Sequence, residues 1–283
     1  RPRCECMMRI DAHQHFWHYD PVRDAWITDE METLKRDFLP GELEDLLAAH
    51  RMDGSIAVQA DQSEAETRFL LDIANRHSTI LGVVGWVDLL AQNLPDRLEH
   101  YSTFEEFRGI RHIAQAEADH FLARGDIVHS LGMLRDFGLT YDILVYPRQL
   151  PSALSLVERL PDQPFVIDHM AKPLVTRGVM EPWKTQMREL ATYPNVWCKV
   201  SGLVTEADRA NSPPDVLRHY LDDVYDAFST RKVMFGSDWP VCLLSASYRQ
   251  VVDLIQKYVE QFPSSEREGV FGENAAHFYG LSV

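Results

Sequence analysis

Short apolar runs alternate along this chain with longer stretches in which apolar positions recur every three or four residues. The runs are rich in Val, Ile and Phe and end at polar or turn residues, a pattern typical of buried β-strands. There are eight of them: Arg9 to Phe16, Gly54 to Ala60, Ile80 to Val87, Phe107 to Ile113, Leu139 to Tyr146, Phe165 to His169, Val196 to Ser201 and Val233 to Asp238. Seven stretches between or after them have the spacing of amphipathic helices: Pro40 to Arg51, Ser63 to His77, Asp126 to Phe137, Leu150 to Leu160, Trp183 to Thr192, Pro214 to Phe228 and Tyr248 to Gln261. Strands that alternate with helices in this way predict an α/β fold, the (β/α)8 or TIM barrel.

The length of the chain fits one such barrel. The sequence has 283 residues, near the typical size of about 250 residues for this fold, so we predict a single barrel domain over residues 9–283. Residues 1–8 lack the apolar core of a secretory signal, and we expect them to form a leader, disordered or non-native, outside the fold. The longest connection, from Trp17 to about Leu39, is rich in Trp, Tyr and Asp, which is typical of a loop that covers a site.

Composition and charge narrow the choice of partners. The net charge of −15 argues against nucleic acid and against an anionic membrane, because both would repel this surface. No apolar run approaches the ~20 residues of a membrane-spanning helix. The cysteines Cys4, Cys6, Cys198 and Cys242 have no zinc-ribbon spacing and predict no disulfide framework, so we expect a cytoplasmic protein. A homo-oligomer is compatible with the sequence, which does not determine the oligomeric state.

Polar residues gather at the predicted strand ends. His13 and His15 lie two residues apart at the end of the first strand, so both imidazoles face one side, ~6.6 Å apart along the strand. The last strand ends in Asp238, just before Pro240. In barrels of this kind the strand ends form the active site. The other strand-end residues are Gln59, Asp61, Trp86, Asp88, Arg111, His112, Asp142, His169, Lys199 and Ser201. Such groups suit water activation and carbonyl polarisation.

The residues alone leave alternatives open. The paired histidines can be structural, and Asp238 can cap the following helix or pair with Arg111. His112 and Asp142 are as compatible with a structural role as with substrate binding.

Several phrases together resemble the amidohydrolase superfamily. The His13-Gln14-His15 start, the Asp168-His169 strand end and the Gly236-Ser237-Asp238-Trp239-Pro240 phrase carry this resemblance. Further phrases are similar to the sugar-lactonase branch of that superfamily: Gly85-Trp86-Val87-Asp88, Arg108-Gly109-Ile110-Arg111-His112, Tyr146-Pro147-Arg148-Gln149-Leu150, Asp168-His169-Met170-Ala171-Lys172-Pro173, Cys198-Lys199-Val200-Ser201-Gly202-Leu203 and Gly272-Glu273-Asn274-Ala275-Ala276. The resemblance runs from Met8 to the C-terminus.

The resemblance implies a hydrolase with specific residue roles. It implies that Asp238 is the general base that takes a proton from the attacking water, and that His169 polarises or protonates the lactone carbonyl. It also implies that His13 and His15, with His169 and Asp238, are the ligands of one divalent metal, zinc first, for which imidazole and carboxylate are suitable partners. The implied reaction opens the ring of an aldonolactone to give the aldonic acid in sugar catabolism, and L-fuconolactone is the leading candidate for the substrate.

The chain departs from the metal-dependent pattern in one place. Many metal-binding members carry a histidine at the end of the fifth strand or a bridging lysine on the fourth, whereas the fifth strand here reads Leu139-Thr140-Tyr141-Asp142-Ile143-Leu144. A sugar lactone is an activated ester and needs less polarisation than an amide, so Asp238 and the imidazoles could act without an obligatory ion. The sequence therefore predicts a divalent metal site and leaves the requirement for the metal open.

The remaining strand-end residues fit a polyhydroxylated ring. Arg111 and Lys199 can donate to the lactone oxygens or to the carboxylate that forms. Hydrogen bonds to hydroxyls and stacking on an apolar sugar face are expected from Gln59, Asp88, His112 and Asp142, and from Trp26 or Trp86, respectively.

Two other functions stay as alternatives. A metal-dependent decarboxylase of the same superfamily is one, and the missing fifth-strand histidine counts against it. A non-catalytic sugar-binding barrel is the other, and the concentration of ionisable groups at the strand ends counts against it.

Overall fold

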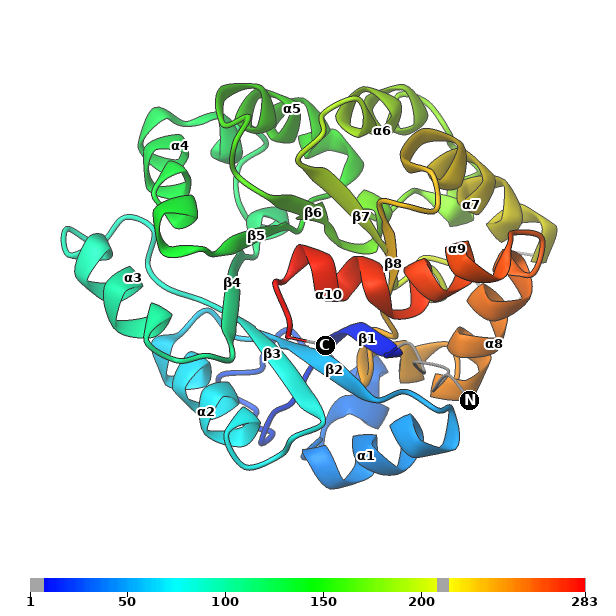
Figure 1. Ribbon diagram of the computed structural model, residues 1–283, viewed down its shortest axis with the longest axis horizontal. Coiled ribbons are helices and arrows are strands. Elements are labelled where there is room, and N and C mark those ends of the chain that lie inside the picture. The colour runs from blue at the N-terminus through cyan, green and yellow to red at the C-terminus, as the bar shows by residue number, and fades with distance from the viewer. Residues whose placement is uncertain (1–7, 208–213, 283) are drawn as a thin grey trace, which may run out of the picture.

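A barrel of eight parallel strands surrounded by helices forms the computed structural model, which describes residues 8–207 and 214–282 (Figure 1). The strands are β1 (Ile10–Gln14), β2 (Gly54–Val58), β3 (Ile80–Gly85), β4 (Phe107–His112), β5 (Thr140–Ile143), β6 (Phe165–Ile167), β7 (Val196–Val200) and β8 (Val233–Phe235), and they pair in sequence order. The barrel closes between β1 and β8, where Asp238 N donates to His13 O at 2.9 Å and His15 N donates to Trp239 O at 2.8 Å. The predicted (β/α)8 fold is confirmed.

Most of the helices form the outer layer of the barrel in Figure 1, and the last one lies across one end of it. They are α1 (Pro40–Ala49), α2 (Glu64–Ala74), α3 (Leu94–Ser102), α4 (Gly125–Gly132), α5 (Leu150–Arg159), α6 (Trp183–Ala191), α7 (Pro214–Phe228), α8 (Tyr248–Val259), α9 (Ser264–Glu268) and α10 (Asn274–Phe278). The sequence pattern missed α3, which is short and buries only Leu94, Leu98 and Tyr101. With α3 included, a helix follows every strand.

The C-terminal helix α10 crosses the barrel axis at the end opposite the strand C-termini (red in Figure 1). Its residues Ala275 and Phe278 join an apolar cluster with strand residues such as Val84 and Met234. The turn before α10 packs directly on the chain that enters β1, because a Cβ at Gly272 would lie only 1.7 Å from the carbonyl oxygen of Met8. One end of the barrel is thus filled, and the strand C-termini at the other end are left for a site.

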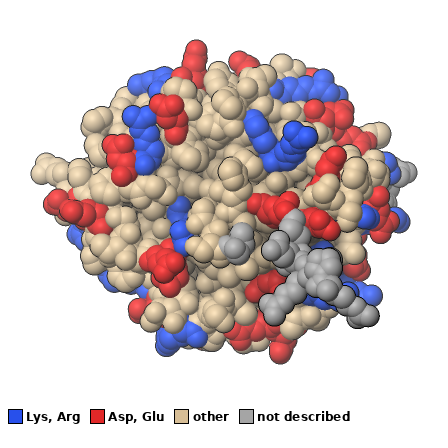
Figure 2. Space-filling model, viewed as in Figure 1, with Lys and Arg blue, Asp and Glu red and all other residues tan. Residues whose placement is uncertain are grey.

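The surface and the termini bear on the remaining predictions. Among the described residues, no helix is long and apolar enough to cross a membrane. Acidic and basic side chains are interspersed on the face drawn in Figure 2. Apart from Met8, the predicted leader lies outside the described residues, and so do Cys4 and Cys6. Cys198 and Cys242 are buried free thiols.

Candidate active site

A cavity of about 340 Å³ lies where the strands end. Its polar lining residues include His15, His169 and Asp238, together with Arg111 and Lys172. The long connection after β1 supplies Trp17 and Trp26 to the wall of the cavity, and Trp17 also belongs to the hydrophobic core. Trp26 is 41% exposed and packs edge-to-face on Trp17, with the ring centroids 5.9 Å apart.

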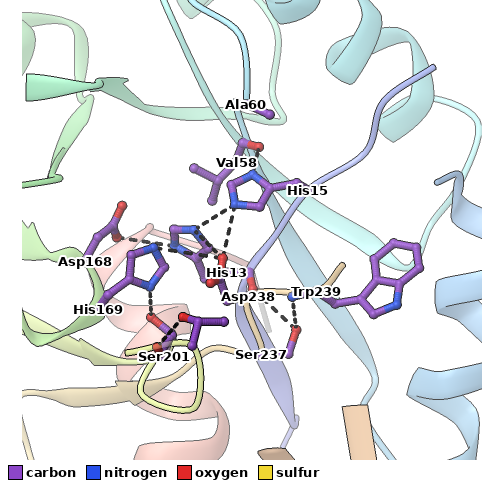
Figure 3. Close-up of polar contacts among 12 residues, drawn as sticks. His13, His15, Val58, Ala60, Asp168, His169, Ser201, Ser237, Asp238 and Trp239 are labelled. Atoms are coloured by element: carbon purple, nitrogen blue, oxygen red, sulfur yellow. Dashed lines mark hydrogen bonds and ion pairs between the residues drawn. The ribbon is translucent and has the colours of Figure 1, made fainter. Parts of the chain in front are cut away.

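His13 and His15 turn their Nε2 atoms toward each other, as Figure 3 shows. These two atoms lie 3.2 Å apart. The Nδ1 of His15 donates to the carbonyl oxygen of Val58 at 2.7 Å, because a carbonyl can only accept. The tautomer with its proton on Nδ1 has a lone pair on Nε2. The Nδ1 of His13 lies 3.3 Å from Asp168 Oδ1. Burial holds the pKa of His13 well below its ordinary value, which keeps the ring neutral.

Asp238 points one carboxylate oxygen at three imidazoles. Its Oδ1 lies 3.4 Å from His15 Nε2 and 3.9 Å from the Nε2 atoms of both His13 and His169. The backbone is left-handed at this residue, with φ of 58°, which directs the carboxylate inward just after β8. Burial works to raise the pKa of Asp238, but His169, His15 and His13 together hold it well below its usual range. Asp238 is therefore an ionised carboxylate inside a mostly buried site.

His169 follows β6 and is held from behind by Ser201. Its Nδ1 lies 2.8 Å from Ser201 Oγ. Burial is the main cause that lowers the pKa of His169 to about 4, so the imidazole is neutral at neutral pH. Gly202 lets the next loop approach the ring, because a Cβ there would lie 2.8 Å from His169 Nδ1.

Arg111 and Gln59 form the wall beside His13. The Arg111 guanidinium donates from Nε to Gln59 Oε1 at 3.0 Å, from Nη1 to Asp168 Oδ2 at 3.1 Å, and from Nη2 to the Gln59 carbonyl. Its Nη1 also lies 3.3 Å from His13 Nε2. Arg111 lines the cavity, whereas Gln59 is fully buried behind it.

Lys199 and Asp142 lie behind His13 and do not line the cavity. Lys199 Nζ is 2.5 Å from Asp142 Oδ2, 3.1 Å from Asp168 Oδ1 and 3.1 Å from His13 Nδ1. Tyr279, beyond α10, donates its hydroxyl to Asp142 Oδ2 at 2.9 Å. Although burial opposes ionisation, the charges of Lys199 and Arg111 and the hydrogen bond from His13 hold the pKa of Asp168 well below its usual range. This buried network fixes the position of His13.

Three further candidates are held away from the cavity. Trp86 Nε1 donates to His112 Nδ1 at 3.2 Å, and His112 Nε2 lies 3.0 Å from Glu117 Oε1. His112 also stacks on Phe121, with the ring centroids 4.8 Å apart. Asp88 is exposed and accepts from the backbone N of Leu90 at 2.9 Å. The structure does not bring Trp86, Asp88 or His112 to the cavity wall.

Comparison with known proteins agrees with this geometry. The family model described as Amidohydrolase matches residues 10–281. The chain belongs to the amidohydrolase family. It is 41% identical to an L-fucono-1,5-lactonase of Burkholderia multivorans over 97% of this chain and 96% of that protein. It is 38% identical to an L-fucono-1,5-lactonase of Burkholderia ambifaria, over 96% of each chain.

Two solved structures illustrate how similar this amidohydrolase is to other proteins. An amidohydrolase from Burkholderia multivorans, crystallised with bound zinc, has a TM-score of 0.94 and 40% identity, and the match covers 97% of this chain and all of that one. The 5-carboxyvanillate decarboxylase of Sphingomonas paucimobilis has a TM-score of 0.66 and 14% identity, covers 98% of this chain and all of its own, and shares the fold alone. The resemblance to the amidohydrolase superfamily is confirmed.

The site of this amidohydrolase fits a divalent metal ion. Ligand atoms of His13, His169 and Asp238 all lie within 4.8 Å of one another, and His15 Nε2 is close to two of them. Imidazoles with one carboxylate form a nitrogen and oxygen donor set that zinc accepts. The other nitrogen of each imidazole has a protein partner, as is usual for metal-binding histidines. These residues and the zinc-bound relative support the predicted cofactor, one divalent metal ion with zinc as the leading candidate.

Sequence reasoning missed part of the cavity wall. Gln62, Gln115 and Lys172 line it and come from the connections after β2, β4 and β6. Gln62 joins two of these connections, because its Oε1 accepts from Ile113 N at 2.7 Å. Their only signal in the sequence is position, three residues after the strand-end candidates Gln59, His112 and His169. The path of a connection cannot be deduced from that.

Proposed function

We propose that this amidohydrolase is a lactonase that hydrolyses L-fucono-1,5-lactone to L-fuconate. One observation carries the proposal: an ionised carboxylate, Asp238, faces the imidazoles of His13, His15 and His169 at the floor of a cavity large enough for a sugar ring. The near full-length similarity to two L-fucono-1,5-lactonases supports this substrate.

Asp238 acts as the general base. Its low pKa keeps it ionised, and its Oδ1 takes a proton from a water molecule as the water oxygen adds to the lactone carbonyl carbon. The tetrahedral species then collapses, the bond between the carbonyl carbon and the ring oxygen breaks, and the ring oxygen takes the proton that Asp238 removed from the water to become a hydroxyl. The product is the open-chain aldonic acid, which ionises to the aldonate.

His169 has two possible roles, and Ser201 selects between them. When Ser201 donates to Nδ1, the proton of neutral His169 sits on Nε2, which can then donate to the lactone carbonyl oxygen. When Nδ1 donates to Ser201 Oγ, the Nε2 lone pair is available as a metal ligand. A divalent metal held by His13, His15, His169 and Asp238 would act as a Lewis acid and acidify a water molecule.

The decisive test is an assay of proton release on a panel of aldonolactones, with chelator-treated protein and with added zinc. We expect L-fucono-1,5-lactone to be the best substrate. Hydrolysis that survives chelation makes Asp238 and His169 sufficient, and hydrolysis restored only by zinc makes the metal essential. An absence of turnover on every lactone in both conditions contradicts the proposal and favours a decarboxylase or a sugar-binding barrel.

The finer predictions about partners and location belong with this proposal. A neutral sugar lactone is the partner we expect, and the net charge of −15 supports the prediction that nucleic acid is not one. The cytoplasmic location and a homo-oligomeric state stay predictions.

A further inference from the structure

The turn that follows β6 has an unusual backbone. Four consecutive residues that are not glycine, His169, Met170, Ala171 and Lys172, have left-handed φ values of 52°, 53°, 56° and 49°. The left-handed conformation brings the Cβ atom close to the carbonyl oxygen, so a run of such residues is disfavoured in isolation. Strain of this kind persists only where the surroundings determine the backbone, and it is concentrated at functional sites.

Tertiary contacts hold this turn in place. The Trp183 indole, at the start of α6, donates to the carbonyl oxygen of Met170 at 2.7 Å. Met170 and Ala171 are fully buried, and Lys172 N donates to His169 O at 2.8 Å, which closes the turn. A turn closed between residues i and i+3 has about three residues per repeat, so the side chains of His169 and Lys172 emerge on the same side. Both His169 and Lys172 line the cavity.

Lys172 differs from the other cations of the site in its free hydrogen-bonding capacity. Every nitrogen of the Arg111 guanidinium already donates to Gln59 or Asp168. Lys199 is fully buried between Asp142 and Asp168. Within the described part of the chain, the Lys172 ammonium makes no hydrogen bond, and its ion-pair partner, Glu206 Oε1, is 3.7 Å away.

The surroundings position the Lys172 ammonium and leave its N–H donors available. Its side chain is 21% exposed, and that of Glu206 is 24% exposed. Glu206 therefore anchors the charge at the rim of the cavity, at a distance that leaves three N–H donors for a ligand. The ring of Tyr146 lies below the ammonium, with Nζ 5.8 Å from its centroid.

We propose that Lys172 binds the carboxylate that ring opening creates, and this proposal rests on the proposed lactonase function. The neutral lactone becomes an anion in the reaction, and the new carboxylate forms at the carbon that Asp238 and His169 serve. Lys172 enters the cavity on the same side as His169, and among the described cations of the site it is the one with donors to spare. It is thus a product-binding residue, and it favours the charged product more than the neutral substrate.

The test compares the product inhibition constant of L-fuconate with the KM of L-fucono-1,5-lactone. In Lys172→Met we expect the inhibition constant to rise at least tenfold while KM rises less than threefold. The product is an anion that loses its cationic partner, whereas the substrate is neutral. Lys172→Arg keeps the charge and should stay within threefold of the wild type in both quantities. Lys184→Met is the matched control, because Lys184 forms an ion pair with Asp223 at 2.6 Å and lies outside this cavity.

The outcomes separate this proposal from the lactonase proposal. A wild-type protein that hydrolyses no lactone overturns the function itself. A wild type that is active, with an unchanged inhibition constant in Lys172→Met, overturns the role of Lys172 alone. Equal rises in both constants also contradict it, because they indicate a displaced turn. If Lys172→Met fails to fold, Glu206→Gln provides the second variant, and we expect it to shift the inhibition constant more than KM.

Discussion

At the scale of single residues, the charge on Asp238 is the feature on which the proposed chemistry depends. Asp238→Asn keeps the size of the side chain but removes the base that takes the proton from water. We expect kcat for lactone hydrolysis to fall by about 10²- to 10⁴-fold, with the circular dichroism spectrum unchanged. Proton-release rates on chelator-treated and zinc-loaded protein measure this loss.

Asp88→Asn is the control for the same chemical change. Asp88 is exposed and serves a backbone N–H outside the cavity, so its variant should keep kcat within about twofold, as expected of surface substitutions. An Asp238→Asn protein with kcat within tenfold of the wild type would show that another group is the base.

Residues at strand ends are predictable because the strand fixes where they point. His13, His15, His169 and Asp238 come together in the structure as the sequence pattern indicates. Lys172 is not predictable in this way, because its left-handed turn depends on the hydrogen bond from Trp183, a residue that no local pattern connects with it. Trp86 and His112 are predicted to contact the sugar, yet in the structure Trp86 Nε1 donates a hydrogen bond to His112 Nδ1 and neither side chain lines the cavity.

At the scale of elements, the Asp11 carboxylate joins the strand that carries the histidines to the loop that carries Asp238. Its Oδ1 accepts from His13 N at 3.2 Å and from Ser237 N at 2.8 Å. Asp11→Ala leaves two buried N–H groups without an acceptor, so we expect a loss of about 2 to 4 kcal/mol in the free energy of unfolding. We also expect zinc affinity to fall by about 10- to 100-fold, as is typical when groups supporting metal ligands are removed. Denaturant titration and metal competition measure the two effects.

Two other variants test whether the acceptor is the cause. The amide oxygen of Asp11→Asn can accept from both N–H groups, and its NH2 can donate to the Tyr248 hydroxyl, which lies 3.1 Å from Asp11 Oδ2. This variant should therefore resemble the wild type in zinc affinity. Tyr248→Phe leaves the Oδ1 contacts intact and should do the same. Equal damage in Asp11→Asn and Asp11→Ala would mean that the charge matters, and not the joining of the two elements.

At the scale of the whole molecule, the barrel is predictable because its strands are short, buried runs with polar residues gathered at their C-terminal ends, and because most of its helices show one apolar stripe. The interior of the barrel and its outer face are both buried, so the strands appear as short runs that are mostly apolar, such as Val233–Phe235, and even the polar residues of β1 are buried. The helix α3 escapes this reasoning because only three of its nine residues are buried. The plug formed by α10 escapes it too, because five helical residues carry no periodic signal, and their place depends on the close approach of Gly272 to Met8.

The stability of the whole fold should depend on the protonation of Glu66, a buried acid of α2. Its carboxyl accepts from Ala60 N at 3.1 Å and Asp61 N at 2.5 Å and so holds the connection after β2. Burial is the main cause that raises its pKa from 4.5 to about 8. A carboxyl with a raised pKa holds its proton more tightly in the folded chain, so its contribution favours folding below pH 4.5 and is lost as the pH rises toward 8.

The variant Glu66→Gln tests this dependence, because its side chain cannot ionise and its amide oxygen can still accept from Asp61 N. The free energy of unfolding of this variant, relative to the wild type, should therefore increase between pH 5 and pH 8 by on the order of 3 to 5 kcal/mol. Denaturant titrations at several pH values measure the difference, and Glu99→Gln, at an exposed position on α3, should show no such trend. A difference that stays constant over this range would mean that the carboxylate is stabilised by its N–H donors as strongly as burial opposes it.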